Sequence, residues 1–174
     1  GLQTKTISKW IISKSSVIRI MPNIFISSNN SSTAVYANNL NKNIKNKIVK
    51  DFGEFGDISW VKKEEQINFF TAMFGGGPAY LFYILNCLNK IIKKNGFTES
   101  ESLSAIKLLL KGVLEDINKK NYKFSDSIQT VASKGGTTEE GLKVLSKRDN
   151  LFKLFEKAIM SAEKKSKIIS KILE

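Results

Sequence analysis

Residues 131–142 read V-A-S-K-G-G-T-T-E-E-G-L, and the rest of the chain is best interpreted outward from them. The paired glycines predict a tight turn, since glycine adopts backbone conformations that other residues resist. A helix is expected directly afterwards, capped by Thr137 or Thr138, with Glu139 and Glu140 in its first turn. Such a turn presents N–H groups and hydroxyls to a small carboxylate or phosphate. An ordinary corner between two helices has the same pattern, so these residues alone leave both interpretations open.

The composition is that of a globular chain with an excess of lysine. Of its 174 residues, 41% are hydrophobic and 25% are charged, and the net charge is +12. This length provides one good core, or a small domain joined to part of another. Lysines are spread over every segment, and arginine, which groove readers and phosphate clamps favour, occurs only at Arg19 and Arg148. We therefore expect most of the lysines to lie on solvent-exposed faces of helices, and we expect no nucleic-acid partner.

Cysteine and histidine usage excludes several kinds of site. Cys87 is the one cysteine and there is no histidine, so neither a disulfide framework nor a Cys/His zinc site is expected. No apolar run reaches the roughly 18 residues of a membrane span, and no basic-then-apolar leader opens the chain. The sequence favours a cytoplasmic protein without a metal or a membrane partner.

Residues 1–62 are predicted to be the end of an α/β domain. Their spacing predicts helices over 2–12 and 43–52 and strands over 17–21, 33–37 and 57–61. Alternation of this kind is typical of a parallel sheet covered by helices. Three strands are few for such a sheet, and the chain opens at Gly1 without a strand, so we expect part of the domain to be missing upstream.

Residues 63–174 are predicted to be all helical. The segment 64–74 leads into three glycines, and Pro78 fits the first turn of the helix that follows. That helix, over 79–94, is apolar around most of its circumference, so we expect a second subunit to cover part of it. Thr98 and Glu101 have the spacing of a capping box for a long helix to 117. Further helices are expected over 124–132, after Thr138, and beyond a polar break at 147–150.

Three segments together resemble the pyrroline-5-carboxylate reductase family. They are V-I-R-I-M-P-N at 17–23, T-A-M-F-G-G-G-P-A-Y at 71–80 and S-K-G-G-T-T at 133–138. Family members usually read V-I-R-x-M-P-N-T-P, T-x-L-S-G-S-G-P-A-Y and S-P-G-G-T-T. The resemblance covers nearly the whole chain but only the C-terminal part of the family's usual length. It implies the C-terminal part of a Rossmann-type dinucleotide-binding domain over 1–62 and a helical dimerisation and substrate-binding domain over 63–174, mainly α overall.

The resemblance also implies a reaction and a substrate turn. Enzymes of this family transfer a hydride from NADPH or NADH to the C=N carbon of 1-pyrroline-5-carboxylate, giving L-proline. By correspondence, Ser133 and the N–H groups of Gly135, Gly136 and Thr137 would hold the substrate carboxylate. The hydroxyl of Thr138 would face the ring nitrogen, which makes Thr138 the expected catalytic residue.

The cofactor side is implied in the same way. Met21, Pro22 and Asn23 match the family's loop near the nicotinamide. Thr71, Gly75, Gly76 and Gly77 match the turn beneath the cofactor and substrate, where a helix N-terminus faces the site. The family forms homodimers, and in some members rings of dimers, so the implied partners are a second copy and the small-molecule substrate.

The chain departs from the family pattern at several positions. Phe74 and Gly76 replace two serines, Ile24 and Phe25 replace Thr-Pro, and Lys134 replaces a proline. No G-x-G-x-x-G turn for the cofactor pyrophosphate occurs in the sequence. We therefore expect an NAD(P)H-dependent oxidoreductase in fragment or truncated form, inactive by itself. The alternative is a non-catalytic relative that serves as a dimerisation module.

Overall fold

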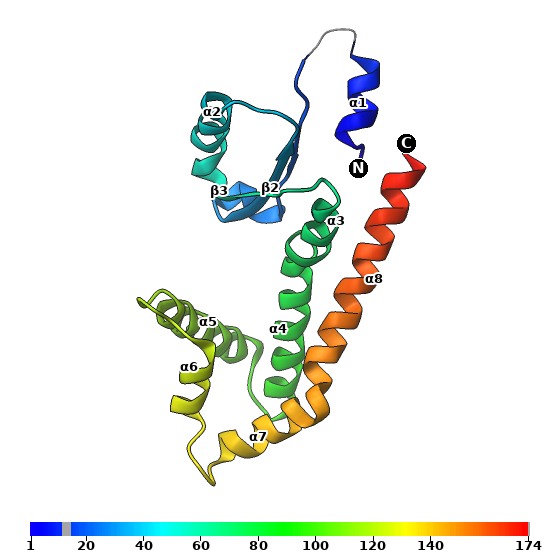
Figure 1. The fold of residues 1–174 in the computed structure, drawn as a ribbon. Helices are drawn as coiled ribbons and strands as arrows, with labels where there is room; N and C mark the ends of the chain where they lie inside the picture. Colours follow the sequence, from blue (N-terminus) through cyan, green and yellow to red (C-terminus); the bar gives the residue numbers. More distant parts are fainter. Residues whose placement is uncertain (12–14, 174) are drawn as a thin grey trace. The chain divides into compact units, whose positions relative to one another are not determined.

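The computed structural model describes residues 1–11 and 15–173. The described residues are mainly helical and include one three-stranded sheet, which confirms the fold class (Figure 1). The chain forms two compact units: residues 1–79 with 156–174, and residues 80–155. The elements are α1 Thr4–Trp10, β1 Ile18–Met21, β2 Ser31–Ala37, α2 Lys42–Phe52, β3 Gly56–Trp60, α3 Gln66–Phe70, α4 Gly77–Lys94, α5 Glu99–Ile117, α6 Phe124–Val131, α7 Thr137–Ser146 and α8 Asn150–Ile172.

The sheet of the first unit is mixed, which corrects the expectation of a parallel sheet. Its strand order is β1-β2-β3; β2 and β3 are parallel, with α2 as the crossover, but β1 runs antiparallel to β2. A parallel connection needs about a dozen residues or more. The link from β1 to β2 instead contains a 3₁₀ turn, Ile24–Ser28, which ends at the left-handed Asn29 and reverses the chain.

The N-terminal helix is shorter than the predicted span. It covers Thr4–Trp10, and the end of the prediction at Ile12 lies outside the described residues. The carboxylate of Glu64 binds the first residue of this helix, because it accepts hydrogen bonds from the backbone N–H and the hydroxyl of Thr4 at 2.8 and 2.6 Å. Glu64 also pairs with Arg19 of β1 at 3.1 Å. This polar cluster joins α1, β1 and the residues before α3.

The core of the first unit lies between the sheet and α3. Ala34, Ile67 and Phe70 are buried there, with Met21 and Val61 packed against them. A close approach of β2 and β3 depends on Gly56, whose φ is +135°. A Cβ at that position would lie 2.1 Å from the carbonyl oxygen of Ser31. The strand pair therefore requires glycine at position 56.

A π-helical turn, Thr71–Gly75, follows α3 directly. The N–H of Gly76 donates to the carbonyl of Thr71 at 3.0 Å, closing the wider turn. The sequence predicted one regular helix over 64–74 and gave no signal of this turn. The helix after it, α4, begins at Gly77 with Pro78 in its first turn, as predicted. π-helical turns are rare and often mark functional sites.

The second unit is a set of helices joined by polar corners. The capping box at the start of α5 is confirmed: Thr98 and Glu101 exchange hydrogen bonds between side chain and backbone. Beside it, Ser102 donates to Asn89 of α4, whose amide donates to Glu99 at 3.0 Å. Lys93 also pairs with Glu99. These polar bonds fasten α4 to α5.

The predicted break before the last helix is confirmed. Residues 147–149 form a 3₁₀ turn in which Arg148 and Asp149 have positive φ, and α8 begins at Asn150. Residues 156–174 belong to the first unit, so the two compact units do not follow the chain order. The domain boundary after residue 62 remains a prediction.

Candidate functional site

The turn before α7 has the geometry that its glycines predict. The N–H of Gly136 donates to the carbonyl of Ser133 at 3.0 Å, and Gly135 has a φ of +75°. A Cβ on Gly136 would lie 2.7 Å from the hydroxyl oxygen of Ser133 and 3.0 Å from its carbonyl oxygen. Gly135 thus supplies the left-handed conformation, and Gly136 the space for Ser133.

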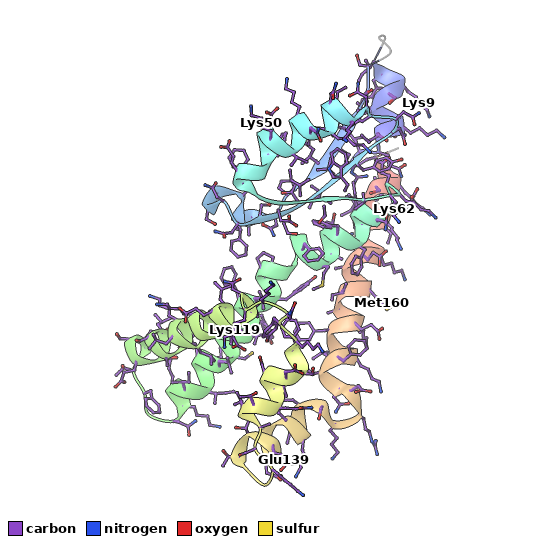
Figure 2. All side chains as sticks on the ribbon, turned by 60° about the vertical axis from the view of Figure 1, so that its left-hand side comes forward. Lys9, Lys50, Lys62, Lys119, Glu139 and Met160 are labelled. Atoms are coloured by element: carbon purple, nitrogen blue, oxygen red, sulfur yellow. The ribbon has the colours of Figure 1, made fainter. Side chains whose placement is uncertain are left out.

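The helix begins at Thr137, directly after the turn, but neither threonine caps it. Gly136 is the N-cap residue and makes no side-chain cap, so Thr137 and Thr138 are already the first two helical residues. The expected threonine cap is therefore wrong. Glu139 performs a related role, because its carboxylate accepts a hydrogen bond from the N–H of Gly135 at 2.6 Å. Glu139 is labelled in Figure 2, at the start of α7.

The amides of the turn differ in how available they are to a ligand. Gly135 donates to Glu139 and Gly136 donates to Ser133, so two of the three amides expected to bind a carboxylate have internal acceptors. The N–H groups of Thr137 and Thr138 lie in the first helical turn, where no intrahelical acceptor exists. Both threonines and Ser133 are exposed. The turn is therefore accessible to a carboxylate, although Glu139 already accepts the hydrogen bond of Gly135.

Thr138 also lines an apolar groove of the second unit. The groove, of about 740 Å³, lies among α5, α6 and α7 and is lined largely by aliphatic and aromatic side chains, including Leu108, Val113, Phe124 and Ile128. Asp116 and Lys119 line the same groove. A hydrogen bond from Lys119 lowers the pKa of Asp116, with a further bond from Ser127, and the same contact raises the pKa of Lys119.

The cofactor-side residues come together in the first unit. Asn23 donates through its side-chain amide to the carbonyl of Phe74 at 3.3 Å, and its backbone N–H donates to the hydroxyl of Ser31 at 3.1 Å. A Cβ on Gly75 would lie 3.2 Å from the methyl group of Met21. The end of β1 and the glycine turn are therefore in contact, as the predicted grouping of Met21, Pro22 and Asn23 with Gly75 requires.

The remaining residues of this group line the same turn. Thr71 donates its hydroxyl to the carbonyl of Ile67 at 2.7 Å, and Gly76 closes the π-helical turn. The ring of Phe74, which stands where the family has serine, lies 4.6 Å from the ring of Phe70. At Gly77 a Cβ would meet nothing within 4 Å, so open space adjoins the start of α4. The N-terminus of that helix favours a negatively charged group.

Each predicted group is therefore assembled within its own unit. The first unit holds the residues predicted to contact the cofactor, at 21–23, 71 and 75–77, and the second holds the turn at 133–138 that is predicted to bind the substrate. Sequence reasoning missed two contributors, Glu139 as an internal acceptor and Asn23 as the tie to Phe74. Glu139 stands three residues after the N-cap Gly136, the position from which a carboxylate can reach back to an N–H group before the helix.

The described residues also bear on metal sites and membrane spans. Across residues 1–11 and 15–173, no cluster of acidic or cysteine side chains is suited to a metal ion. Within the same part of the chain, none of the helices has the length and apolarity that crossing a bilayer demands.

Comparison with known proteins identifies the relatives of this chain. The family described as "Pyrroline-5-carboxylate reductase dimerisation" matches residues 64–169. A pyrroline-5-carboxylate reductase of Staphylococcus aureus strain COL is 30% identical over 99% of this chain and 63% of its own length. That of Staphylococcus epidermidis RP62A is 29% identical, over 98% of this chain and 62% of its own length.

Solved structures of pyrroline-5-carboxylate reductases also superpose on this chain. A pyrroline-5-carboxylate reductase from Coxiella burnetii superposes with a TM-score of 0.91 at 32% identity, covering 98% of this chain and 63% of that one. The Plasmodium falciparum pyrroline carboxylate reductase, crystallised with NADP bound, gives 0.86 at 26% identity, with 97% and 64% covered. The chain thus spans less than two thirds of the length of these relatives.

Proposed function

The chain belongs to the pyrroline-5-carboxylate reductase family, and from this premise we propose that it carries the substrate-binding turn and part of the cofactor site of such a reductase. The reaction is hydride transfer to 1-pyrroline-5-carboxylate, which gives L-proline. The observation that carries the proposal is the exposed turn Ser133–Gly136, which leads directly into α7. A small anion such as a carboxylate suits such a helix start.

In this proposal the turn binds the ring carboxylate and α7 positions the ring. The N–H groups of the first helical turn and the hydroxyl of Ser133 hold the carboxylate, while the Thr138 hydroxyl faces the ring nitrogen. Thr138 also lines the apolar groove, which suits the CH₂ groups of a five-membered ring. Thr138 is the proposed catalytic residue because its hydroxyl touches the atom that gains a proton when the imine is reduced.

The first unit supplies a partial fit to a nicotinamide cofactor. Met21, Pro22, Asn23 and Thr71 and the glycines at 75–77 would contact it, since the start of α4 is open to a ligand there. When bound, NADPH or NADH supplies the hydride. The described strands of the first unit include no G-x-G-x-x-G turn for the pyrophosphate, so these residues hold only one part of the cofactor. We accordingly propose the domain boundary after residue 62 and infer that the chain alone is not a competent reductase.

Homodimerisation is part of the same proposal. Of the buried hydrophobic residues in the described chain, Ile106 is the one that lies between residues 80 and 155. Leu81 is 58% exposed on α4, and Leu108 and Leu114 are 67% and 59% exposed on α5. A unit of this size is not stable without a core, so a second copy is the cover we propose for these faces.

A non-catalytic dimerisation module remains the second candidate. Two observations favour it: Phe74 puts a bulky ring where the family has a serine hydroxyl, and Gly135 and Gly136 already have internal acceptors. A protein of this kind would keep the helices but not the ligand. The cytoplasmic location and rings of dimers stay predictions from the sequence.

Calorimetric titration with L-proline separates the two candidates. We expect saturable binding to the 174-residue chain, weakened roughly tenfold in Thr138→Ala, because one hydrogen bond to the ring is lost. Ser146→Ala is the matched control, since Ser146 is exposed in the same helix, lies outside the groove, and its hydroxyl donates to the carbonyl of Leu142 within α7. An absence of binding by a folded chain would favour the dimerisation module. Equal losses in both variants would remove Thr138 from the site.

A further inference from the structure

Asn68 is a buried polar residue that has no role in the proposed reaction. It lies in α3 and is only 7% exposed. Its side-chain oxygen accepts hydrogen bonds from Ser166 at 2.9 Å and from Ser170 at 3.4 Å, both on α8. Its amide nitrogen donates to the carbonyl of Glu65 at 3.1 Å. Every polar atom of this side chain therefore has a partner within the first unit.

These bonds fasten a helix that has little stability of its own. Together, α3 and the π-helical turn that continues it span residues 66–75, which is still short of the roughly 12–15 residues that an isolated helix needs to persist in water. One side of α3 is held by Ile67 and Phe70 in the core beneath the sheet. Asn68 lies about 100° around the helix from Ile67, so the bonds to α8 hold a second side. Together the two sides fix the rotation of α3 about its axis.

The rotation of α3 matters because the π-helical turn continues from it without a break. That turn places one extra residue between the carbonyl of Thr71 and the N–H of Gly76. A sparsely populated backbone conformation persists where its surroundings over-determine it. A rotation of α3 would move the carbonyl of Thr71, which closes the wide turn, and with it Gly75 beside Met21.

We propose that Asn68 is a positioning residue that, by fastening α3 to Ser166 and Ser170 of α8, maintains the π-helical turn and so the placement of Thr71 and Gly75. The inference rests on the proposed function only in assigning these residues to the cofactor side. α8 is then an active support of the cofactor site. Ser170 is only 3% exposed and Ser166 is partly buried, as a permanent contact requires.

Amide hydrogen exchange of the 174-residue chain, followed by NMR, tests the proposal. In Ser166→Ala/Ser170→Ala, the amide of Gly76 is expected to exchange roughly tenfold faster, since the variant removes hydrogen bonds that hold the turn closed. The amide of Val61, which donates to the carbonyl of Val35 in the same unit, reports overall stability and should change much less. Ser161→Ala, at an exposed position of α8, is the matched control and should leave both rates unchanged.

A conservative variant separates the hydroxyl from its packing. Ser166→Thr keeps the hydroxyl, so Gly76 should retain its protection and the resonances of Gly75 and the Met21 methyl group should stay in place. If the amides of Gly76 and Val61 exchanged faster by the same factor in the double variant, the effect would be a general loss of stability, and the proposal would be overturned. An unchanged exchange rate of Gly76 in the double variant would also overturn it. No ligand is present, so this result stands apart from the L-proline titration, and either proposal can fail alone.

Discussion

Replacing Gly136 by alanine should strain the turn before α7, and the distances in the turn allow the loss of stability to be estimated. The new Cβ would lie 2.7 Å from the hydroxyl oxygen of Ser133, which a side-chain rotation can relieve. It would also lie 3.0 Å from the carbonyl oxygen of Ser133, which is backbone and moves only with the turn. The carbonyl accepts the N–H of Gly136 itself, so the closing hydrogen bond is strained at the same time. We expect a loss of about 1–3 kcal/mol in the free energy of unfolding.

Gly141→Ala is the matched control because it lies in the same helix. A Cβ there would meet nothing within 4 Å, so alanine should stabilise α7 by up to about 1 kcal/mol. Urea unfolding followed by circular dichroism, at one fixed protein concentration, measures both variants. L-Proline binding should weaken in Gly136→Ala and persist in Gly141→Ala. A Gly136→Ala chain that is as stable as the parent, or that binds equally well, would refute this account of the turn.

Three further outcomes are expected. A hydrogen bond from Lys93 is the main cause that lowers the pKa of Glu99 in the folded chain. The ionised Glu99 therefore stabilises the fold fully above pH 4.5, its ordinary pKa, and this contribution is lost as the pH falls through the lowered pKa of the folded state. Unfolding measured at pH 7 and pH 3 should show a smaller loss of stability in Lys93→Met than in the parent chain. Glu139→Gln weakens the internal acceptor of Gly135 and should raise affinity for L-proline roughly threefold to tenfold, whereas unchanged affinity would show that the two carboxylates do not compete. Leu81→Asp should abolish the dimer in light scattering and Ile24→Asp, also exposed, should not; a dimer that survives Leu81→Asp would place the interface elsewhere.

The sequence predicted the fold class and the glycine turn before α7 because those features depend on local chemistry. Gly135 requires a positive φ, Pro78 suits a first helical turn, and Thr98 with Glu101 forms a capping box whatever lies around them. Features of this kind are encoded within a few residues, so no long-range contact can reverse them.

Other features depended on distant residues and could not be predicted. The antiparallel pairing of β1 follows from how a short link packs, and the alternation of strands gave no indication of it. The π-helical turn follows from holding α3 on two sides, one of them by residues about a hundred positions later in the chain. Glu139 took the place of a threonine cap because helix geometry placed its carboxylate opposite Gly135.

An NMR titration of the 174-residue chain with L-proline, resolved by residue, tests whether the turn before α7 binds the substrate. We expect the backbone amides of residues 135–138 to shift together along one saturable curve, because those groups receive the carboxylate at the start of α7. Resonances of Thr71 and Gly75 should not follow that curve, since we propose that they contact the cofactor. Shifts scattered over the exposed lysines, or none at the turn while the chain stays folded, would contradict a substrate site at Ser133–Thr138.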